Sequence, residues 1–389
     1  MKRVLFSSFS ALGSFPHGRA WRLPIAGLAL VLLAACSGGA NKPKPTELKA
    51  VVPVVPVQQV WTARLGAVNF PLAVNVSGTT LYAAASDGLV AAIDARTGHD
   101  VWSLNLATPL AAGVGSDGRV AAVVTQGNEL VAVVDGREIW REKLTAQAYT
   151  APFVAGGRIF VLTADRAVHA FDGNNGRKLW MQQRPTEPLV LRQAGVLLAV
   201  GDTLVAGLAG RLTGLNPANG SVRWEVPIAS PRGINDVERL VDLVGPVSRL
   251  NDVVCVRAFQ ASVGCVNAAR GILQWTKAAD GNVGLDGDER LVFAVESDGK
   301  VVTWQRVDGE AGWRSEQLRY RGLTAPRVVG RSVAIGDASG FVHLLSRENG
   351  ALLNRLTTDG SAIIATPMLV GETLVVVTRA GTIFGFQPQ

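Results

Sequence analysis

Residues that bind metals or carry redox chemistry are scarce in this sequence. Its 389 residues include only three cysteines and four histidines. The cysteines form neither an adjacent pair nor a C-x-x-C-H haem-attachment motif: Cys36, Cys255 and Cys265. Three histidines lie beyond the first 35 residues, without a second ligand at metal-like spacing: His99, His169 and His343. Since we also find no calcium-type oxygen cluster, nucleophile elbow or phosphate-binding loop, we expect no metal, no cofactor and no catalytic residue.

Helix signals are also sparse. Apolar runs are short and rich in Val and Ala, and clusters of Gly, Asn and Asp interrupt them at regular intervals. The hydrophobic content of 48% and the 43 glycines exclude a disordered chain. The sequence therefore predicts an all-β protein.

The N-terminus carries an address signal. The apolar run from Ile25 to Ala35 is too short to span a bilayer, but it suits the core of a signal peptide. The run ends in Leu-Ala-Ala-Cys, which resembles the lipobox of bacterial lipoproteins. That resemblance implies a signal peptide over 1–35, cleavage before Cys36 and acylation of Cys36, and Ser37 then favours the outer membrane. Ordinary signal cleavage near Ala35 is the alternative.

The mature chain is only weakly basic. The sequence has a formal charge of +7, and four basic residues before Cys36 leave with the signal, so 7 − 4 gives +3. Such a small, scattered charge excludes a nucleic-acid footprint. The Pro-rich segment 36–56 predicts a tether of about 50 Å, or, in its last part, an edge strand on the folded body.

A repeat fills the rest of the chain. A glycine is followed four residues later by a tryptophan in six repeats, with a further tryptophan one period upstream and an asparagine at the last position. The period is about 42 residues. The positions are Trp61, Gly98/Trp102, Gly136/Trp140, Gly176/Trp180, Gly220/Trp224, Gly271/Trp275, Gly309/Trp313 and Gly350/Asn354.

Each repeat predicts four strands. A hairpin with a turn such as Asp87-Gly88 comes first, then a tight turn with a glycine, a strand with the tryptophan, and one further short strand. Four strands and one packing tryptophan per repeat are typical of a β-propeller blade. Eight outer-strand positions predict an eight-bladed β-propeller over 57–389, in which the strand Val57 to Trp61 closes the ring on the C-terminal blade. Two separate β-domains are the alternative, but no linker is visible in mid-chain.

These repeats carry a family resemblance. The stretches "AIDARTGHDVW" and "AFDGNNGRKLW" resemble the docking repeats of pyrroloquinoline-quinone (PQQ) dehydrogenases. A lipobox followed by eight such blades is more similar to the BamB family, lipoproteins of the outer-membrane β-barrel assembly (BAM) complex. This resemblance implies a non-catalytic scaffold on the periplasmic face that binds the POTRA domains of BamA and aids the insertion of β-barrel proteins. The abundance of strands adds the hypothesis that strand edges of the propeller pair with unfolded β-barrel proteins. A PQQ-dependent dehydrogenase and a periplasmic propeller with another protein partner remain as alternatives.

The partner site is expected where the repeat is longest. Two adjacent steps exceed the period, 224 − 180 = 44 and 275 − 224 = 51 residues, and both carry their extra residues between an outer strand and the next inner strand. The two connections should therefore emerge on one rim. The BamB resemblance adds an L-x-L-R stretch and a D/E-R-L-x-D stretch that contact BamA, whose matches here are Leu189, Leu191, Arg192, Glu238, Arg239, Leu240 and Asp242. Val244 replaces a further acid of the family pattern, and Leu189 and Leu191 could instead begin an inner strand.

The cysteines of the fifth repeat admit two arrangements. A two-residue turn at Gln260-Ala261 would put Cys255 and Cys265 on opposite faces of a hairpin, and a three-residue turn would set them directly across from each other. Cys265 also takes the position that small residues hold in other repeats. We expect buried free thiols.

Overall fold

The computed structural model describes residues 43–184, 189–231, 234–235 and 239–389. The chain divides into two compact units, Met1–Lys44 and Pro45–Gln389. Cys36 and the expected signal peptide lie outside the described residues. All strands of the described residues belong to the second unit.

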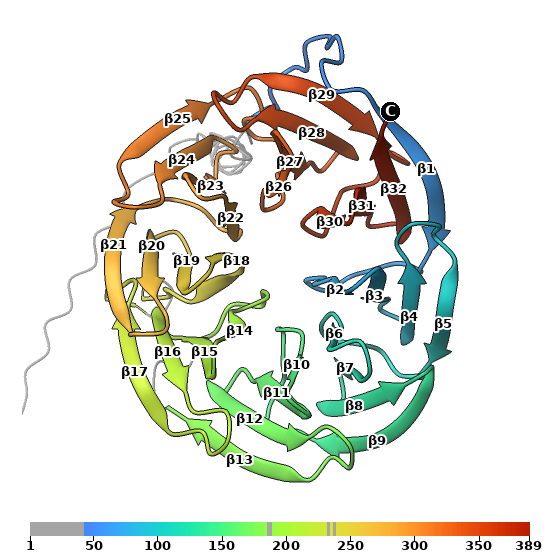
Figure 1. Ribbon diagram of the computed structural model, residues 1–389, viewed down its shortest axis with the longest axis vertical. Helices are drawn as coiled ribbons and strands as arrows, with labels where there is room; N and C mark the ends of the chain where they lie inside the picture. Colours follow the sequence, from blue (N-terminus) through green and yellow to red (C-terminus); the bar gives the residue numbers. More distant parts are fainter. Residues whose placement is uncertain (1–42, 185–188, 232–233, 236–238) are drawn as a thin grey trace, which may run out of the picture. The chain divides into compact units, whose positions relative to one another are not determined.

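The second unit is a ring of eight four-stranded antiparallel sheets, arranged as the blades of a propeller (Figure 1). Blades 1 and 2 consist of β2 (Asn75–Ser77), β3 (Thr80–Ala84), β4 (Leu89–Asp94), β5 (Asp100–Asn105), and of β6 (Gly115–Ser116), β7 (Ala121–Val124), β8 (Glu129–Val134), β9 (Arg137–Lys143). Blades 3 and 4 consist of β10 (Phe153–Ala155), β11 (Arg158–Leu162), β12 (Ala167–Asp172), β13 (Lys178–Gln183), and of β14 (Leu197–Val200), β15 (Thr203–Leu208), β16 (Arg211–Leu215), β17 (Val222–Pro227).

Blades 5 and 6 consist of β18 (Leu243–Leu250), β19 (Val253–Ala258), β20 (Ser262–Asn267), β21 (Ile272–Ala278), and of β22 (Leu285–Gly287), β23 (Leu291–Val295), β24 (Val301–Gln305), β25 (Ala311–Ser315). Blade 7 consists of β26 (Arg327–Val329), β27 (Ser332–Gly336), β28 (Phe341–Ser346) and β29 (Leu352–Thr357). Blade 8 combines β30 (Met368–Val370), β31 (Thr373–Val377) and β32 (Thr382–Pro388) with the N-terminal strand β1 (Val57–Arg64). Among the described residues, no helix has the length and apolar character needed to cross a membrane.

The ring closes as the sequence predicted. Strand β1 pairs antiparallel with β32, with Trp61 opposite Gly385, so the first and last strands of the ring share one sheet. The all-β, eight-bladed fold with this closure is confirmed. Within a blade, the two middle strands are buried along almost their whole length, whereas an outer strand such as β5 alternates between exposed and half-buried residues. This difference arises because a middle strand is covered on both faces and an outer strand on one.

Tryptophan and glycine meet at seven of the eight seams between blades. Each indole packs on the glycine of the next blade, so close that a Cβ on that glycine would lie about 2.5 to 3.2 Å from the indole side chain. At the Trp61 seam, the indole Nε1 also donates a 3.0 Å hydrogen bond to the Ala95 carbonyl. Gly98 there has φ +75°, so it supplies both the turn and the flat surface. The seven pairs are Trp61/Gly98, Trp102/Gly136, Trp140/Gly176, Trp180/Gly220, Trp224/Gly271, Trp275/Gly309 and Trp313/Gly350.

The seam between blades 7 and 8 is built differently. Asn354 of β29 replaces the tryptophan, and its Nδ2 donates a 2.8 Å hydrogen bond to the Val55 carbonyl. Val57, four residues before Trp61, stands where the other blades carry the glycine. Because the chain enters and leaves here, no tight turn joins β32 to β1.

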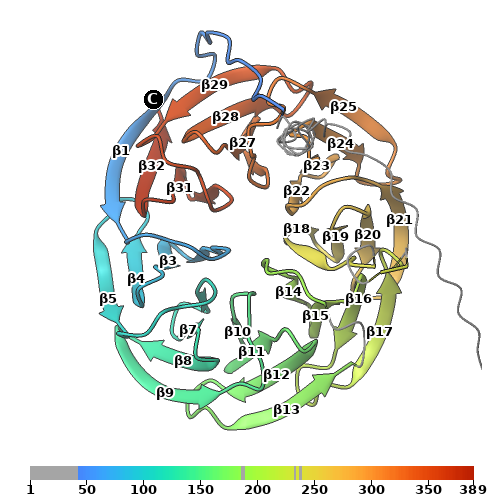
Figure 2. The same cartoon turned by 180° about the vertical axis from the view of Figure 1, so that it is seen from behind.

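Part of the segment expected as a tether lies on the propeller. Thr46 donates its amide to the Arg319 carbonyl, and Val54 donates its amide to the Leu353 carbonyl of β29. Figures 1 and 2 both show this segment, in blue, outside β29 before it enters β1. Residues 46–56 therefore run from the connection between blades 6 and 7 to the outer side of β29 in blade 7.

The expectation of free thiols in blade 5 is wrong. Cys255 and Cys265 are directly opposed in the β19–β20 pair and form a disulfide. The pairing of Ala258 with Ser262 leaves three residues in the turn, and Gln260 adopts φ +47°. The sequence left the length of this turn open, and the three-residue turn is the one that sets the two cysteines directly across from each other.

Candidate partner-binding site

The first long connection, whose described part includes residues 189–196, forms a loop between β13 and β14 with exposed side chains. Leu189 is 38% exposed, Leu191 is half-buried and Arg192 is exposed. Strand β14 begins only at Leu197, so Leu189 and Leu191 do not start an inner strand. The sequence alternative in which they do is therefore wrong.

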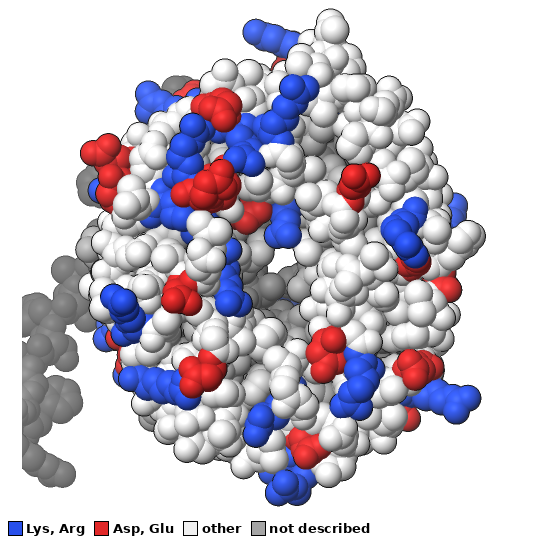
Figure 3. All heavy atoms as spheres, in the orientation of Figure 1, with Lys and Arg blue, Asp and Glu red and all other residues white. Residues whose placement is uncertain are grey.

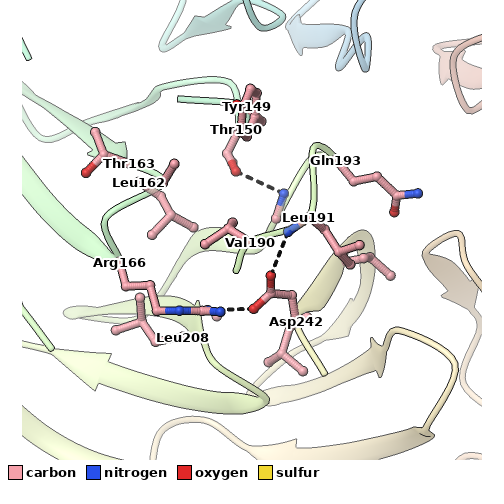
Figure 4. Close-up of a pocket in the computed structure, with 15 residues that line it drawn as sticks. Tyr149, Thr150, Leu162, Thr163, Arg166, Val190, Leu191, Gln193, Leu208 and Asp242 are labelled. Carbon is pink, nitrogen blue, oxygen red and sulfur yellow. Dashed lines mark hydrogen bonds and ion pairs between the residues drawn. The ribbon is translucent and has the colours of Figure 1, made fainter. Parts of the chain in front are cut away.

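The loop is held in place by a buried ion pair. Arg166 and Asp242 are 7% and 9% exposed, and Arg166 Nη1 lies 2.5 Å from Asp242 Oδ1. Arg166 Nη2 donates to the Leu189 carbonyl at 2.7 Å, and the Leu191 amide donates to Asp242 Oδ2 at 2.9 Å. Figure 4 shows the two side chains end to end below the loop. Charge-assisted bonds of this kind fix the main chain at Leu189 and Leu191.

Arg166 was missed by sequence reasoning, although a signal for it exists. It has φ +59° and closes the turn between β11 and β12. The equivalent turn position is a glycine in four other blades, at Gly88, Gly299, Gly340 and Gly381, all with positive φ. A side chain other than glycine in left-handed conformation is strained. An arginine at this turn position is therefore a sign that its side chain has a specific partner.

The second long connection reaches the same place. Asp242 lies at its end, immediately before β18, and the Gly245 amide donates to the Ala194 carbonyl of the first connection at 2.9 Å. The structure thus brings the two connections together on one rim, as the sequence predicted from their spacing. Because its carboxylate binds Arg166 and Leu191, Asp242 positions the exposed loop from below.

The other expected residues of this connection are only partly described. Arg239 is half-buried and its amide donates to the Asn235 carbonyl at 3.1 Å. Ile234, the residue before Asn235, is 98% exposed. Glu238 lies outside the described residues.

A small cavity lies beneath the loop. It has a volume of about 40 Å³ and is bordered by Tyr149, Leu162, Val190, Leu208 and the ion pair. A ligand pocket for a small molecule is typically ten times larger. Arg192 extends from the loop over the Tyr149 ring, with its guanidinium carbon 5.9 Å from the ring centre. The geometry therefore favours the outer surface of the loop as the binding element.

Two of the three histidines considered above belong to blade interiors, whereas His99 is exposed in the turn before β5. His169 is 1% exposed and contacts the hydroxyls of Thr145 and Thr163, and burial lowers its pKa to about 4. His343 is fully buried, 3.0 Å from Asp337, and burial lowers its pKa too. Burial opposes ionisation of Asp337, but hydrogen bonds led by that from His343 lower its pKa to about 2. Within the described part of the chain, no three His, Cys, Asp or Glu residues are placed to share a metal ion.

The repeat, the ring and the seams define the class of this protein. It is an eight-bladed β-propeller built from PQQ-type repeats, with an exposed loop on a rigid support. A solved structure of BamB from Moraxella catarrhalis has the same fold, with a TM-score of 0.78, 23% identity, and coverage of 85% of this chain and 99% of that one. A quinohemoprotein alcohol dehydrogenase from Pseudomonas putida shares the fold at a TM-score of 0.67 and 13% identity, covering 88% and 78%.

The sequence relationships are more specific. The family profile described as outer membrane protein assembly factor BamB matches residues 86–315. Proteins of that name from Burkholderia pseudomallei and Bordetella pertussis are 37% and 35% identical to this chain. Each alignment covers 94% of this chain, and 98% or 97% of the relative. The chain belongs to the BamB family, whose named members here are assembly factors rather than enzymes.

Proposed function

We propose that this protein is a non-catalytic scaffold of the BAM complex that aids the assembly and insertion of β-barrel proteins in the outer membrane. The observation that carries the proposal is the buried Arg166–Asp242 pair, whose bonds hold the main chain of an exposed loop. A buried ion pair contributes little net stability. Its use here is to preorganise a binding loop. The names of the relatives supply the process.

The POTRA domains of BamA are the proposed partner of this loop. Leu189 and Leu191 give an apolar anchor, and Arg192 and Arg239 give a charged edge of the residue type that is enriched at interfaces and in hot spots. Asp242 acts from below through the Leu191 amide. The main chain at Leu189 and Leu191 is already held in the free protein, so docking of these two residues costs little ordering entropy.

The proposed location is the periplasmic face of the outer membrane. Cleavage after residue 35 and acylation of Cys36 would anchor the chain stably in the membrane. Several acyl chains give stable membrane binding, whereas a single chain binds only weakly and reversibly. A Cys36→Ala variant should move from the membrane fraction to the soluble periplasmic fraction. Retention of that variant in the membrane fraction at the wild-type level would contradict the lipid anchor.

Unfolded β-barrel proteins are a second proposed contact. In blades 1 and 2 the outermost strands, β5 and β9, have a free edge, and the exposed apolar residues Val101 and Ile139 lie on them. An extended client chain could pair with such an edge. Photo-crosslinkers at Val101 that reach BamA but no unfolded porin would exclude this role.

Co-purification tests the BamA contact. A Leu189→Asp, Arg192→Glu double variant should lose at least tenfold of the BamA recovered from solubilised membranes, because it replaces the anchor and reverses the edge charge. Met181→Asp is the matched control, since Met181 is 42% exposed on β13, outside the loop. Equal BamA recovery with the double variant and with Met181→Asp would refute the interface.

A further variant tests the role of the support. Asp242→Asn keeps the shape of the side chain but weakens its bond to Arg166, so the loop should lose its fixed conformation. We expect weaker BamA binding with an unchanged far-ultraviolet spectrum and faster amide exchange at Leu191. Full BamA binding by a variant with a mobile loop would mean that preorganisation is irrelevant.

A further inference from the structure

The centre of the propeller opens into a large cavity next to the loop. This channel mouth has a volume of about 800 Å³ and is bordered by the connections that enter all eight blades. Arg192 and Gln193, from the loop described above, lie on its border. Figure 4 shows Gln193 pointing away from the Arg166–Asp242 pair. The mouth is therefore continuous with the proposed docking loop.

Charge of one sign gathers at the channel mouth. The described residues that border it include three arginines from separate parts of the ring, Arg192, Arg327 and Arg379, and no aspartate or glutamate. Arg327 Nε lies 3.8 Å from Asp286 Oδ2, so this carboxylate partly neutralises the charge of Arg327. Asp286 itself does not border the channel mouth. The exposed side chains of Arg192 and Arg379 have no ion pair with any described residue. A concave site whose described border carries arginines and no acid attracts anions.

Other exposed arginines of the ring lie beside acids. On blades 6 and 7, Arg290 lies 3.0 Å from Glu348, and Arg347 lies 2.9 Å from Asp288. Figure 3 shows Lys and Arg mixed with Asp and Glu over this part of the ring. The absence of acids from the described border of the channel mouth is thus a local departure from the pattern of the surface.

The remaining border suits a polypeptide. Aromatic and aliphatic side chains, including Phe70 and Met368, alternate with the amides of Asn69 and Asn282. Amides can pair with a peptide backbone, and apolar side chains can cover the side chains of an extended segment. The volume is in the range of binding pockets, roughly 300–1,000 Å³.

We propose that the channel mouth binds an extended acidic segment of a partner protein, with carboxylates on Arg379 and Arg192 and apolar side chains over Phe70. The site goes beyond the proposed BamA docking loop, with which it shares Arg192. It requires a partner loop or tail in which Asp or Glu alternate with apolar residues. Arg379 lies in blade 8, outside the two long connections, so its contribution can be measured separately.

Peptide binding to the intact protein tests the site. The probe is a fluorescein-labelled nonapeptide with three Glu-Phe-Gly units, and its fluorescence anisotropy is measured at 50 and 300 mM salt. We expect saturable binding that Arg379→Glu weakens at least tenfold, and that the higher salt also weakens. Arg137→Glu is the control variant, because Arg137 is exposed at the start of β9 and does not border the channel.

Three results would overturn the proposal. One is equal binding of the probe by the Arg379→Glu and Arg137→Glu variants. Another is equal binding of a peptide with Lys in place of Glu. The third is displacement of the probe by tripolyphosphate at the concentration of the unlabelled peptide, which would make the mouth a general anion site. BamA co-purification with the Arg379→Glu variant separates the two proposals. The docking loop is intact in this variant, so the recovery of BamA should not change.

Discussion

Seven seams of the propeller and the eighth solve the same packing problem with different residues. At the seven regular seams a large indole lies flat on a glycine of the next blade. At the eighth, Asn354 faces a chain entry, and a single amide hydrogen bond to Val55 replaces the indole contact. The paired change is physically coupled, because a residue with a Cβ at the glycine position, here Val57, leaves no room for an indole. Apolar side chains of blades 7 and 8, among them Leu344 and Phe384, pack together across this seam, and the β1–β32 ladder closes the ring inside blade 8.

A side chain forced into a regular seam should have the largest effect. In Gly220→Val the new Cβ would meet the Trp180 ring at 2.5 Å, on a backbone with φ +75°. We expect a loss of about 3–5 kcal/mol in the free energy of unfolding, measured by urea denaturation. Gly201→Val is the control, since Gly201 has φ +57° and a Cβ added there would meet no atom within 4 Å, and it should lose only about 1 kcal/mol. Similar losses in both variants would show that backbone strain, rather than the indole contact, makes these glycines necessary.

Truncation of the seam residues should separate the two kinds of seam. Trp180→Ala removes the indole and its 3.0 Å bond to the Pro217 carbonyl, and we expect a loss of about 3 kcal/mol. Asn354→Ala removes two hydrogen bonds, one donated to the Val55 carbonyl and one accepted from the Arg355 amide, with an expected loss of about 1–2 kcal/mol. Denaturant midpoints of the two variants give the comparison. An equal loss would mean that the eighth seam is held by its side chain as firmly as the others.

Acid should weaken the blades rather than the seams. Burial lowers the pKa of His169 to about 4, against 6.5 for the free side chain, and lowers that of His343. The unfolded chain therefore binds more protons below pH 6.5, so stability present above that pH is lost as the pH falls towards 4. We expect the melting temperature to fall by several degrees between pH 7 and pH 5, and His169→Gln to reduce that fall. A melting temperature independent of pH over this range would show that these histidines do not stay neutral in the folded protein.

The sequence predicted the ring because the residues that recur in the repeat have a specific structural role: glycine allows the tight turn, and tryptophan packs between blades. Gly98 and Trp102 recur at a fixed offset, and Asn354 marks the seam where the chain begins and ends. The disulfide was missed because it depends on turn length, which Gln260 sets by a left-handed conformation unusual for glutamine. Arg166 was missed because its partner Asp242 is 76 residues away, and only the fold shows that the two meet. The two long connections were found from spacing, but the way in which they are fixed could not be.

Hydrogen exchange along β32 tests the closed ring most directly. If β1 pairs with β32 in solution, amides on both sides of β32 are hydrogen-bonded, and they should be protected as strongly as those of β12 in the middle of blade 3. Alternating fast and slow exchange along β32, the signature of a strand with one free edge, would contradict a propeller closed by its N-terminal strand.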